Sequence, residues 1–292
     1  MHITHHKGNI DTANFPSNSL ETIQASLDAQ ADAIEIDVLA LKDKDYLLVH
    51  DDELHSETTG KGAVSDCTVE DAQHLYFKKS INRQKYRVPL LSQVVDQFLK
   101  HDSPTRLQID FKNYFPLVDD EVLHRLLHII EPIRDRVTVS SPADWQLRKL
   151  HRFADWLDVG FDIQFYFDYR GFLQKINPQH PPYREGAYGY YDDHLLSLGK
   201  TWTTSDYLRD RAETLIRQVN GISTLYINHR TLVKCLDDGF NWFEFAQHYD
   251  VKIAVWTVNT KDKKAIRNAK QLISEGATHF ISDTPISLRN TL

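Results

Sequence analysis

Two carboxylates stand two residues apart in one short apolar segment. Glu35 and Asp37 alternate with Ile34, Ile36 and Val38, and side chains two residues apart in a β-strand share a face. Two carboxylates on one buried face repel each other unless a cation compensates their charge. Carboxylate oxygens with open coordination positions suit Mg²⁺ or Ca²⁺. The pair therefore predicts a site for one divalent cation.

A third carboxylate, Asp110, lies in the apolar segment 107–111, and Lys112 follows it two residues later. The same reasoning makes Asp110 a candidate metal ligand. Lys112, together with Lys7 near the N-terminus, could neutralise phosphate oxygens as a point charge. The alternative for each of these residues is a solvated charge at a strand end or a structural ion pair.

Two histidines, His6 and His50, end predicted strands and are candidates for proton transfer. Imidazole titrates near neutral pH, and cleavage of a diester needs a base for the nucleophile and an acid for the leaving alkoxide. The chain has 15 histidines, so a structural role is the alternative for any one of them. Convergence of His6 and His50 with the carboxylates favours the catalytic interpretation. His5 should point into the opposite layer.

The elements that must position these residues alternate between strands and helices. The predicted strands are 2–6, 33–38, 46–50, 106–111, 136–141, 157–163, 223–228, 251–257 and 278–282. Helical patterns cover 19–30, 89–100, 119–131, 143–153, 206–219, 229–248 and 261–275. Too few residues separate the second and third strands for a crossover helix, so these two strands form an antiparallel hairpin. Eight parallel strands remain.

Eight strand–helix units predict an α/β fold of the TIM-type (β/α)8 barrel. Active sites of such barrels lie at the C-terminal ends of the strands, so the hairpin should project at that mouth and bring His50 near Asp37. Residues 1–292 fit one barrel domain with an insertion at about 164–204. The insertion is rich in aromatic residues. It could be a lid over the pocket, a contact in a homo-oligomer, or a packed excursion.

The composition excludes several classes of partner. The net charge is -7 without a basic cluster, which argues against nucleic acid. The two cysteines, Cys67 and Cys235, lack metal-site spacing and read as reduced thiols. No secretory signal opens the chain and no apolar run is long enough for stable membrane insertion. We expect a cytoplasmic enzyme acting on a small molecule.

The ordered motifs resemble those of the glycerophosphodiester phosphodiesterases, a barrel family of the phospholipase C-like phosphodiesterases. The family pattern runs His-Arg-Gly, Pro-Glu-Asn-Thr, Gly-Ala-Asp-Gly-Ile-Glu-x-Asp-Val, Lys-Asp-Gly, His-Asp, Thr-x-Gly-x-Gly, Val-Pro-x-Leu and Ile-Glu-Ile-Lys. The corresponding segments here are His6-Lys7-Gly8, Pro16-Ser17-Asn18-Ser19, 30–38, Lys42-Asp43-Lys44, His50-Asp51, Thr58-Thr59-Gly60-Lys61-Gly62, Val88-Pro89-Leu90-Leu91 and Ile109-Asp110-Phe111-Lys112. Segments 255–259 and 276–285 are similar to the closing pair of strands.

The resemblance implies a role for each matching residue. Glu35, Asp37 and Asp110 would bind one divalent cation, and His6 and His50 would be the acid/base pair. Lys7 and Lys112 would contact the phosphate, and Trp256 would line the substrate side of the pocket. The implied reaction of lipid metabolism hydrolyses a glycerophosphodiester, a deacylated phospholipid, to glycerol 3-phosphate and an alcohol.

Three positions depart from the family pattern: Lys7 replaces arginine, Ser17 replaces glutamate, and Asp110 replaces glutamate. Lysine keeps the charge but loses the bidentate geometry of arginine. Two alternatives follow. The Asp-x-Lys form also resembles sphingomyelinase D-like lyases of the same superfamily, which act on another lipid-derived diester. Lys7 and Ser17 would also suit a non-catalytic barrel that only binds a phosphoester.

Overall fold

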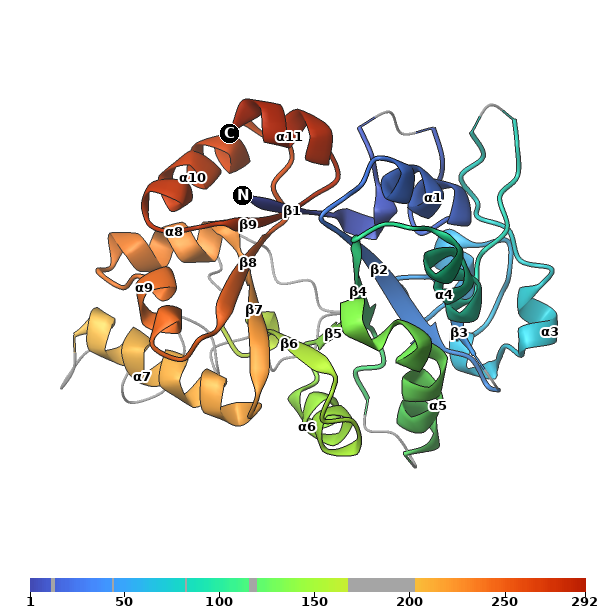
Figure 1. Ribbon diagram of the computed structural model, residues 1–292, viewed down its shortest axis with the longest axis horizontal. Coiled ribbons are helices and arrows are strands. Elements are labelled where there is room, and N and C mark those ends of the chain that lie inside the picture. The colour runs from blue at the N-terminus through green and yellow to red at the C-terminus, as the bar shows by residue number, and fades with distance from the viewer. Residues whose placement is uncertain (12–13, 44, 82, 116–119, 168–202) are drawn as a thin grey trace.

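The structure is a computed structural model that describes residues 1–11, 14–43, 45–81, 83–115, 120–167 and 203–292. Eight parallel strands form its centre (Figure 1). They are β1 His2–His5, β2 Ala33–Ala40, β4 Arg106–Phe111, β5 Val137–Ser141, β6 Asp158–Asp162, β7 Ile222–Asn228, β8 Lys252–Trp256 and β9 His279–Ser282. Because β1 pairs with both β2 and β9, the sheet closes on itself. The predicted TIM-type barrel is confirmed.

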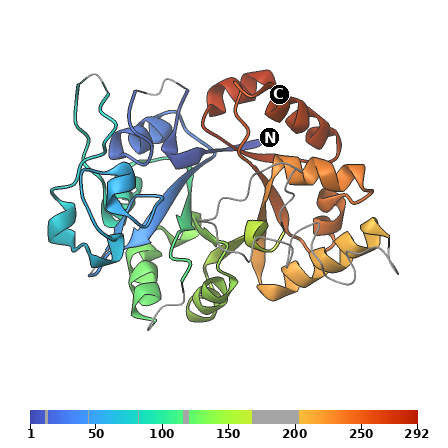
Figure 2. The ribbon, with the colours of Figure 1, turned by 180° about the vertical axis from the view of Figure 1, so that it is seen from behind.

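Helices follow the strands and lie around the outside of the barrel, as the front and back views show (Figures 1 and 2). The longer helices are α1 Leu20–Asp28, α4 Leu91–Lys100, α5 Glu121–Ile130, α6 Asp144–Phe153, α7 Thr204–Gln218, α8 His229–Asp237, α9 Trp242–Gln247, α10 Lys263–Ser274 and α11 Pro285–Thr291. Shorter ones are α2 Leu54–Glu57, α3 Val69–Ala72 and the 3-10 turns η1 His6–Gly8, η2 Val64–Asp66, η3 Glu131–Arg136 and η4 Ile163–Phe165.

One predicted helix, 229–248, was wrong as a single element. Gly239 has φ +82, a conformation that ends α8, and the Asn241 side chain then accepts hydrogen bonds from the N–H groups of Phe243 and Glu244 to start α9. A turn conformation that favours glycine and an N-cap two residues later separate the two helices. The helices α2, α3 and α11 were not predicted.

The predicted hairpin is present but its second strand is short. β3 Tyr46–Leu47 pairs antiparallel with β2 through Leu39–Leu47 and Ala40–Tyr46. The strand predicted over 46–50 ends at residue 47, because the Leu48 N–H donates instead to the Pro89 carbonyl at 3.0 Å. The hairpin and the following segment, up to Leu90, enclose a small hydrophobic cluster of their own at the C-terminal end of β2.

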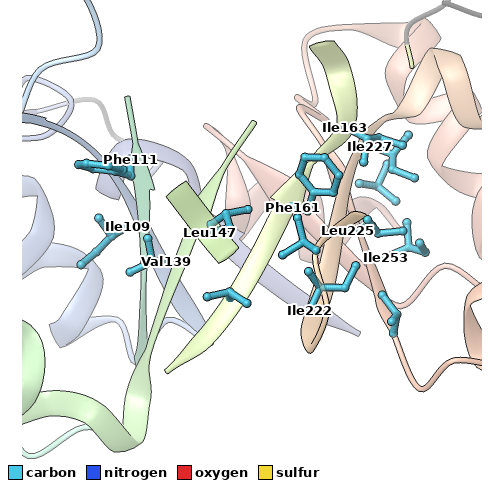
Figure 3. Packing of buried hydrophobic residues seen from close by; sticks show 14 of the residues in the cluster. Ile109, Phe111, Val139, Leu147, Phe161, Ile163, Ile222, Leu225, Ile227 and Ile253 are labelled. Atoms are coloured by element: carbon cyan, nitrogen blue, oxygen red, sulfur yellow. The ribbon is translucent and has the colours of Figure 1, made fainter. Parts of the chain in front are cut away.

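The barrel strands alternate between an apolar outer face and a largely polar inner face. Ile109 and Val139 of two neighbouring strands join Leu147 of α6 in the main hydrophobic core (Figure 3). The alternate side chains on the same strands include the buried Gln108 and Ser140, whose side chains hydrogen-bond at 3.1 Å. Polar side chains therefore face the barrel axis, where they can form a site at the mouth.

Most of the predicted insertion 164–204 lies outside the described residues. Within the described part of the chain, the segment continues from β6 into η4 and resumes at Thr203, which caps α7. The lid and interface alternatives for this segment stay predictions.

Candidate active site

Three carboxylates converge at the C-terminal ends of two neighbouring strands. Glu35 and Asp37 lie on β2, and Asp110 lies on β4 directly opposite Asp37 in the parallel register. One oxygen atom from each carboxylate lies within 4.8 Å of the other two. Glu35 is 3% and Asp37 1% exposed. The parallel register therefore gathers the three acids that the sequence singled out.

The donor set fits a divalent cation. Asp110 Oδ1 is buried and accepts no hydrogen bond from the described residues. Asp37 Oδ1 lies 3.1 Å from the Lys112 ammonium but also lacks a hydrogen bond of good geometry within the described chain. Buried carboxylate oxygens without donors are costly. An all-oxygen ligand set of this kind suits Mg²⁺ or Ca²⁺.

The pKa values of the cluster show the same charge crowding. Burial, followed by the charge of Asp37, raises the pKa of Glu35 to about 7. Burial also acts to raise the pKa of Asp37, but Lys112 and Lys7 outweigh it and hold that pKa well below its ordinary value. One carboxylate is thus compensated by lysines while its neighbour is not.

Both candidate phosphate ligands contact carboxylates in this structure. The Lys7 Nζ atom lies 2.8 Å from Asp37 Oδ2, and Lys112 Nζ lies 2.6 Å from Asp110 Oδ2. Both lysines line the same cavity. They are therefore placed to meet a phosphate at the carboxylate cluster, and their role as its ligands stays a prediction.

A left-handed turn after β1 holds Lys7 in place. Lys7 has φ +54 and Gly8 has φ +66, and the Lys7 N–H donates to Glu35 Oε2 at 2.7 Å. A Cβ atom on Gly8 would lie 3.1 Å from Thr22 Cγ2, so both the backbone angle and the packing favour glycine. The turn thus requires the glycine of the His6-Lys7-Gly8 motif.

His6 follows β1 directly and faces the carboxylates. Its Nε2 atom lies 3.9 Å from Glu35 Oε2, and its Nδ1 atom lies 2.7 Å from Asp283 Oδ1. Burial acts to lower the pKa of His6, but Glu35 and Asp283 outweigh it and raise that pKa. The predicted strand 2–6 ends one residue early, so His6 lies in the turn. His5 points away, with Nδ1 2.8 Å from Ser26 Oγ of α1.

His50 lines the same cavity and lies in the segment that follows β3. Its side chain is 46% exposed, and its Nδ1 atom lies 2.8 Å from Asp51 Oδ1. The His50 N–H also donates to Glu57 Oε2 at 2.7 Å. The two imidazoles therefore line one cavity at the barrel mouth together with Glu35 and Asp110, whereas the buried Asp37 contacts Lys7 and Lys112 and does not line it.

The cavity at the mouth has a volume of about 260 Å³. Trp256 and Thr257 lie on its wall, and Tyr226 and Gln108 also line it. Tyr226 is buried, and burial together with Asp110 raises the pKa of its hydroxyl, so the phenol stays neutral. The Tyr226 ring occupies the space beside Gly160, where a Cβ atom would lie 2.3 Å from the ring.

A larger cavity of about 590 Å³ lies at the opposite end of the barrel. Three of the charged side chains that line it form ion pairs: Arg106 binds Asp158 at 2.7 Å, and Asp32 binds Arg289. Glu35, Asp110 and His6 line the smaller cavity and do not line the larger one. Because barrel enzymes place their chemistry at the C-terminal strand ends, the smaller cavity is the candidate active site.

Several residues of the site were given no role by the sequence reasoning. Asp283 binds His6, and Asn9 and Asn259 donate to Asp283. The Asn18 side chain donates to Asp37 at 3.1 Å. Asp283 lies in the closing segment 276–285 that carried part of the family resemblance, so that motif was the available signal. Ser17, which replaces the family glutamate, donates to Asn9 Oδ1 at 2.9 Å.

A family model described as the glycerophosphoryl diester phosphodiesterase family matches residues 6–165. The chain belongs to this family. The matched region contains the carboxylate cluster, both candidate histidines and both candidate phosphate ligands. The expected family is therefore confirmed.

Named relatives agree with the family assignment. A glycerophosphodiester phosphodiesterase of Bacillus altitudinis is 29% identical over 154 residues, which are 50% of this chain and 60% of that protein. One of Caldanaerobacter subterraneus is 26% identical over 191 residues, 64% of this chain and 73% of that protein. The match thus spans less than two thirds of the length of the first relative and more than two thirds of the length of the second.

Solved structures share the fold across the whole chain. A glycerophosphodiester phosphodiesterase from Parabacteroides distasonis has a TM-score of 0.67 at 15% identity, covering 99% of this chain and 95% of that one. An Oleispira antarctica phosphodiesterase, solved in complex with the product sn-glycerol-3-phosphate, has a TM-score of 0.62 at 14% identity, covering 100% and 96%. At these identities the likeness establishes the barrel.

None of the helices in the described ranges combines the length and apolar character needed to cross a membrane.

Proposed function

We propose that this protein is a metal-dependent phosphodiesterase that hydrolyses glycerophosphodiesters to glycerol 3-phosphate and an alcohol. The observation that carries the proposal is the convergence of two imidazoles, Glu35 and Asp110 on one cavity at the barrel mouth, with Asp37 completing the carboxylate cluster. Membership of the glycerophosphoryl diester phosphodiesterase family supports it.

Glu35, Asp37 and Asp110 would hold one divalent cation, Mg²⁺ or Ca²⁺. Such a cation supplies charge compensation for the phosphoryl oxygens of a bound diester. Lys7 and Lys112 add two ammonium groups on the same side of the cavity. A bound phosphate would therefore lie beside the carboxylate cluster. Lys7, after β1, and Lys112, after β4, would provide positive charge.

His6 and His50 would transfer the protons. One imidazole accepts the proton of the nucleophile, water or a glycerol hydroxyl, as the new phosphorus–oxygen bond forms. The other donates a proton to the alkoxide as the bond to the leaving alcohol breaks. Where the glycerol hydroxyl attacks, water opens the cyclic phosphate in a second step to give glycerol 3-phosphate. His6 Nε2 and the exposed His50 ring lie on the same cavity, which is the arrangement that this exchange requires.

The lining of the cavity favours a deacylated diester over an intact lipid. Charged and hydrogen-bonding side chains dominate the described lining, and the cavity of about 260 Å³ offers no long apolar groove within that part of the chain. Trp256 is the one large aromatic side chain without a hydroxyl there, and it would contact the glycerol or alcohol moiety. This argues against the sphingomyelinase D-like alternative.

The test is an activity screen of the purified chain on glycerophosphocholine, with Mg²⁺, with Ca²⁺ and with excess chelator. We expect metal-dependent release of glycerol 3-phosphate, followed by ³¹P NMR, and loss of at least about 100-fold in kcat for His6→Ala and His50→Ala. A cyclic phosphate product would identify the lyase alternative. Phosphoester binding without turnover in the parent protein would identify the binding-protein alternative.

The proposed ligand is a small-molecule phosphodiester. We propose no nucleic-acid partner and no stable insertion of the protein into a membrane. The single-domain organisation, a homo-oligomeric state and a cytoplasmic location stay predictions.

A further inference from the structure

Three hydrogen-bonded side chains, Asp283, Asn9 and Asn259, lie next to the Nδ1 atom of His6. Asp283 Oδ1 lies 2.7 Å from His6 Nδ1 and 2.9 Å from Asn9 Nδ2. Asp283 Oδ2 lies 2.7 Å from Asn259 Nδ2. Both carboxylate oxygens of Asp283 are therefore engaged, and His6 is one of three side chains that bind it.

We infer that Asp283, held by Asn9 and Asn259, is a positioning residue that fixes the tautomer and orientation of His6 and presents its Nε2 atom to the substrate. The inference rests on the proposed function, because it concerns the imidazole that would transfer a proton there. Asp283 acts through His6, since it does not line the cavity in the described part of the chain.

The acceptor character of Asp283 determines the tautomer of His6. An ionised carboxylate only accepts hydrogen bonds, so the His6 nitrogen beside it, Nδ1, must carry a proton. The lone pair of the neutral ring then lies on Nε2, which faces Glu35 at 3.9 Å. A fixed tautomer of this kind is how a carboxylate orients a catalytic imidazole in other hydrolases.

The other hydrogen bonds of the two asparagines determine which amide atom of each faces Asp283. Asn259 Oδ1 accepts the Asp283 N–H at 2.8 Å, so its amide nitrogen must face the carboxylate. Asn9 Oδ1 accepts the Ser17 hydroxyl at 2.9 Å, which leaves Asn9 Nδ2 for Asp283. These residues come from the loop after β1 and the loop after β8, and together they restrain the carboxylate from two sides.

The first measurement is the ¹⁵N NMR spectrum of the histidine side chains, recorded above the pKa of the ring. His6 is assigned by its loss in His6→Gln. We expect the Nδ1–H tautomer of His6 in the parent protein and the Nε2–H tautomer in Asp283→Asn, whose amide can donate to Nδ1. An Nε2–H tautomer in the parent, or an unchanged tautomer in Asp283→Asn, would overturn the inference.

The second measurement is steady-state kinetics on glycerophosphocholine. We expect kcat to fall about 100-fold in Asp283→Asn with KM changed less than about threefold, and to fall less in Asn9→Ala. Asp11→Asn is the matched control: Asp11 accepts the N–H groups of Ile286 and Ser287 just beyond β9 but does not touch His6. The control should keep the parent kcat.

The two measurements separate the inference from the proposed function. A parent protein without diesterase turnover contradicts the proposed function, and the NMR tautomer still decides the role of Asp283. A parent protein with turnover, whose kcat is unchanged in a folded Asp283→Asn variant, overturns the positioning role and leaves the proposed function standing.

Discussion

Binding of a divalent cation to the carboxylate cluster should weaken sharply below pH 7. Burial and Asp37 raise the pKa of Glu35 to about 7, so a cation that uses this carboxylate must displace its proton. The apparent Kd for the cation is then multiplied by 1 + 10^(7−pH), which is about 11 at pH 6 and about 1.1 at pH 8. We expect Mg²⁺ to bind roughly tenfold more weakly at pH 6 than at pH 8.

The assay is isothermal titration calorimetry of the metal-free protein with Mg²⁺ at pH 6, 7 and 8, in two buffers of different ionisation enthalpy. Glu35 should release about 0.9 proton at pH 6 and about 0.1 at pH 8. His6 lies 3.9 Å from Glu35 and has a raised pKa, so it is a second group from which the cation would displace a proton. The variant His6→Asn removes that second proton; because His6 acts to lower the pKa of Glu35, proton release from Glu35 should extend to higher pH in this variant.

Two variants complete the pH experiment. Glu35→Gln should bind Mg²⁺ more weakly and lose the Glu35 part of the pH dependence. Asp158→Asn, at the opposite end of the barrel beside Arg106, should keep both the affinity and the pH dependence. A parent affinity that is constant within twofold from pH 6 to 8 would refute the reasoning, as would an unchanged pH dependence in Glu35→Gln.

Three further predictions follow from single contacts. Lys7→Met removes the ammonium 2.8 Å from Asp37, so it should tighten Mg²⁺ binding severalfold in calorimetry while raising the KM for substrate; unchanged metal affinity would contradict this. Gly160→Ala should destabilise the protein by about 1–3 kcal/mol through collision with the Tyr226 ring, and much less in a Tyr226→Ala background; additive effects in urea unfolding would exclude that contact. Burial lowers the pKa of His279 to about 3, so the unfolded chain binds a proton that the folded protein does not, and the free energy of unfolding should fall as the pH drops below 6.5. In urea unfolding at pH 7 and pH 5, His279→Asn should lose less of this free energy than the parent protein, and an equal loss in both would contradict the prediction.

The strands and the pairing of acids could be predicted from the sequence because both depend on local periodicity. Alternation of apolar and polar residues over 33–38 requires that Glu35 and Asp37 share one face in any strand. The short connection before β3 allows only an antiparallel return, which the structure has. The prediction of a single helix over 229–248 was wrong because the left-handed turn at Gly239 is a backbone conformation that periodicity does not reveal.

The convergence of the site depends on contacts between segments distant in the chain. Asp110 meets Asp37 because the parallel register of β2 and β4 aligns them, and register depends on the packing of the whole sheet. Asp283 reaches His6 across 277 residues because β1 pairs with β9 when the barrel closes.

The sequence by itself determined which side chains could do chemistry here and on which face of each strand they lie, since both follow from residue type and the two-residue strand period. Only the tertiary structure decided how those faces meet. Barrel closure and strand register set the lysine–carboxylate pairs, the partner of His6 Nδ1 and the cavity that they share. These are long-range packing properties, and no local pattern encodes them.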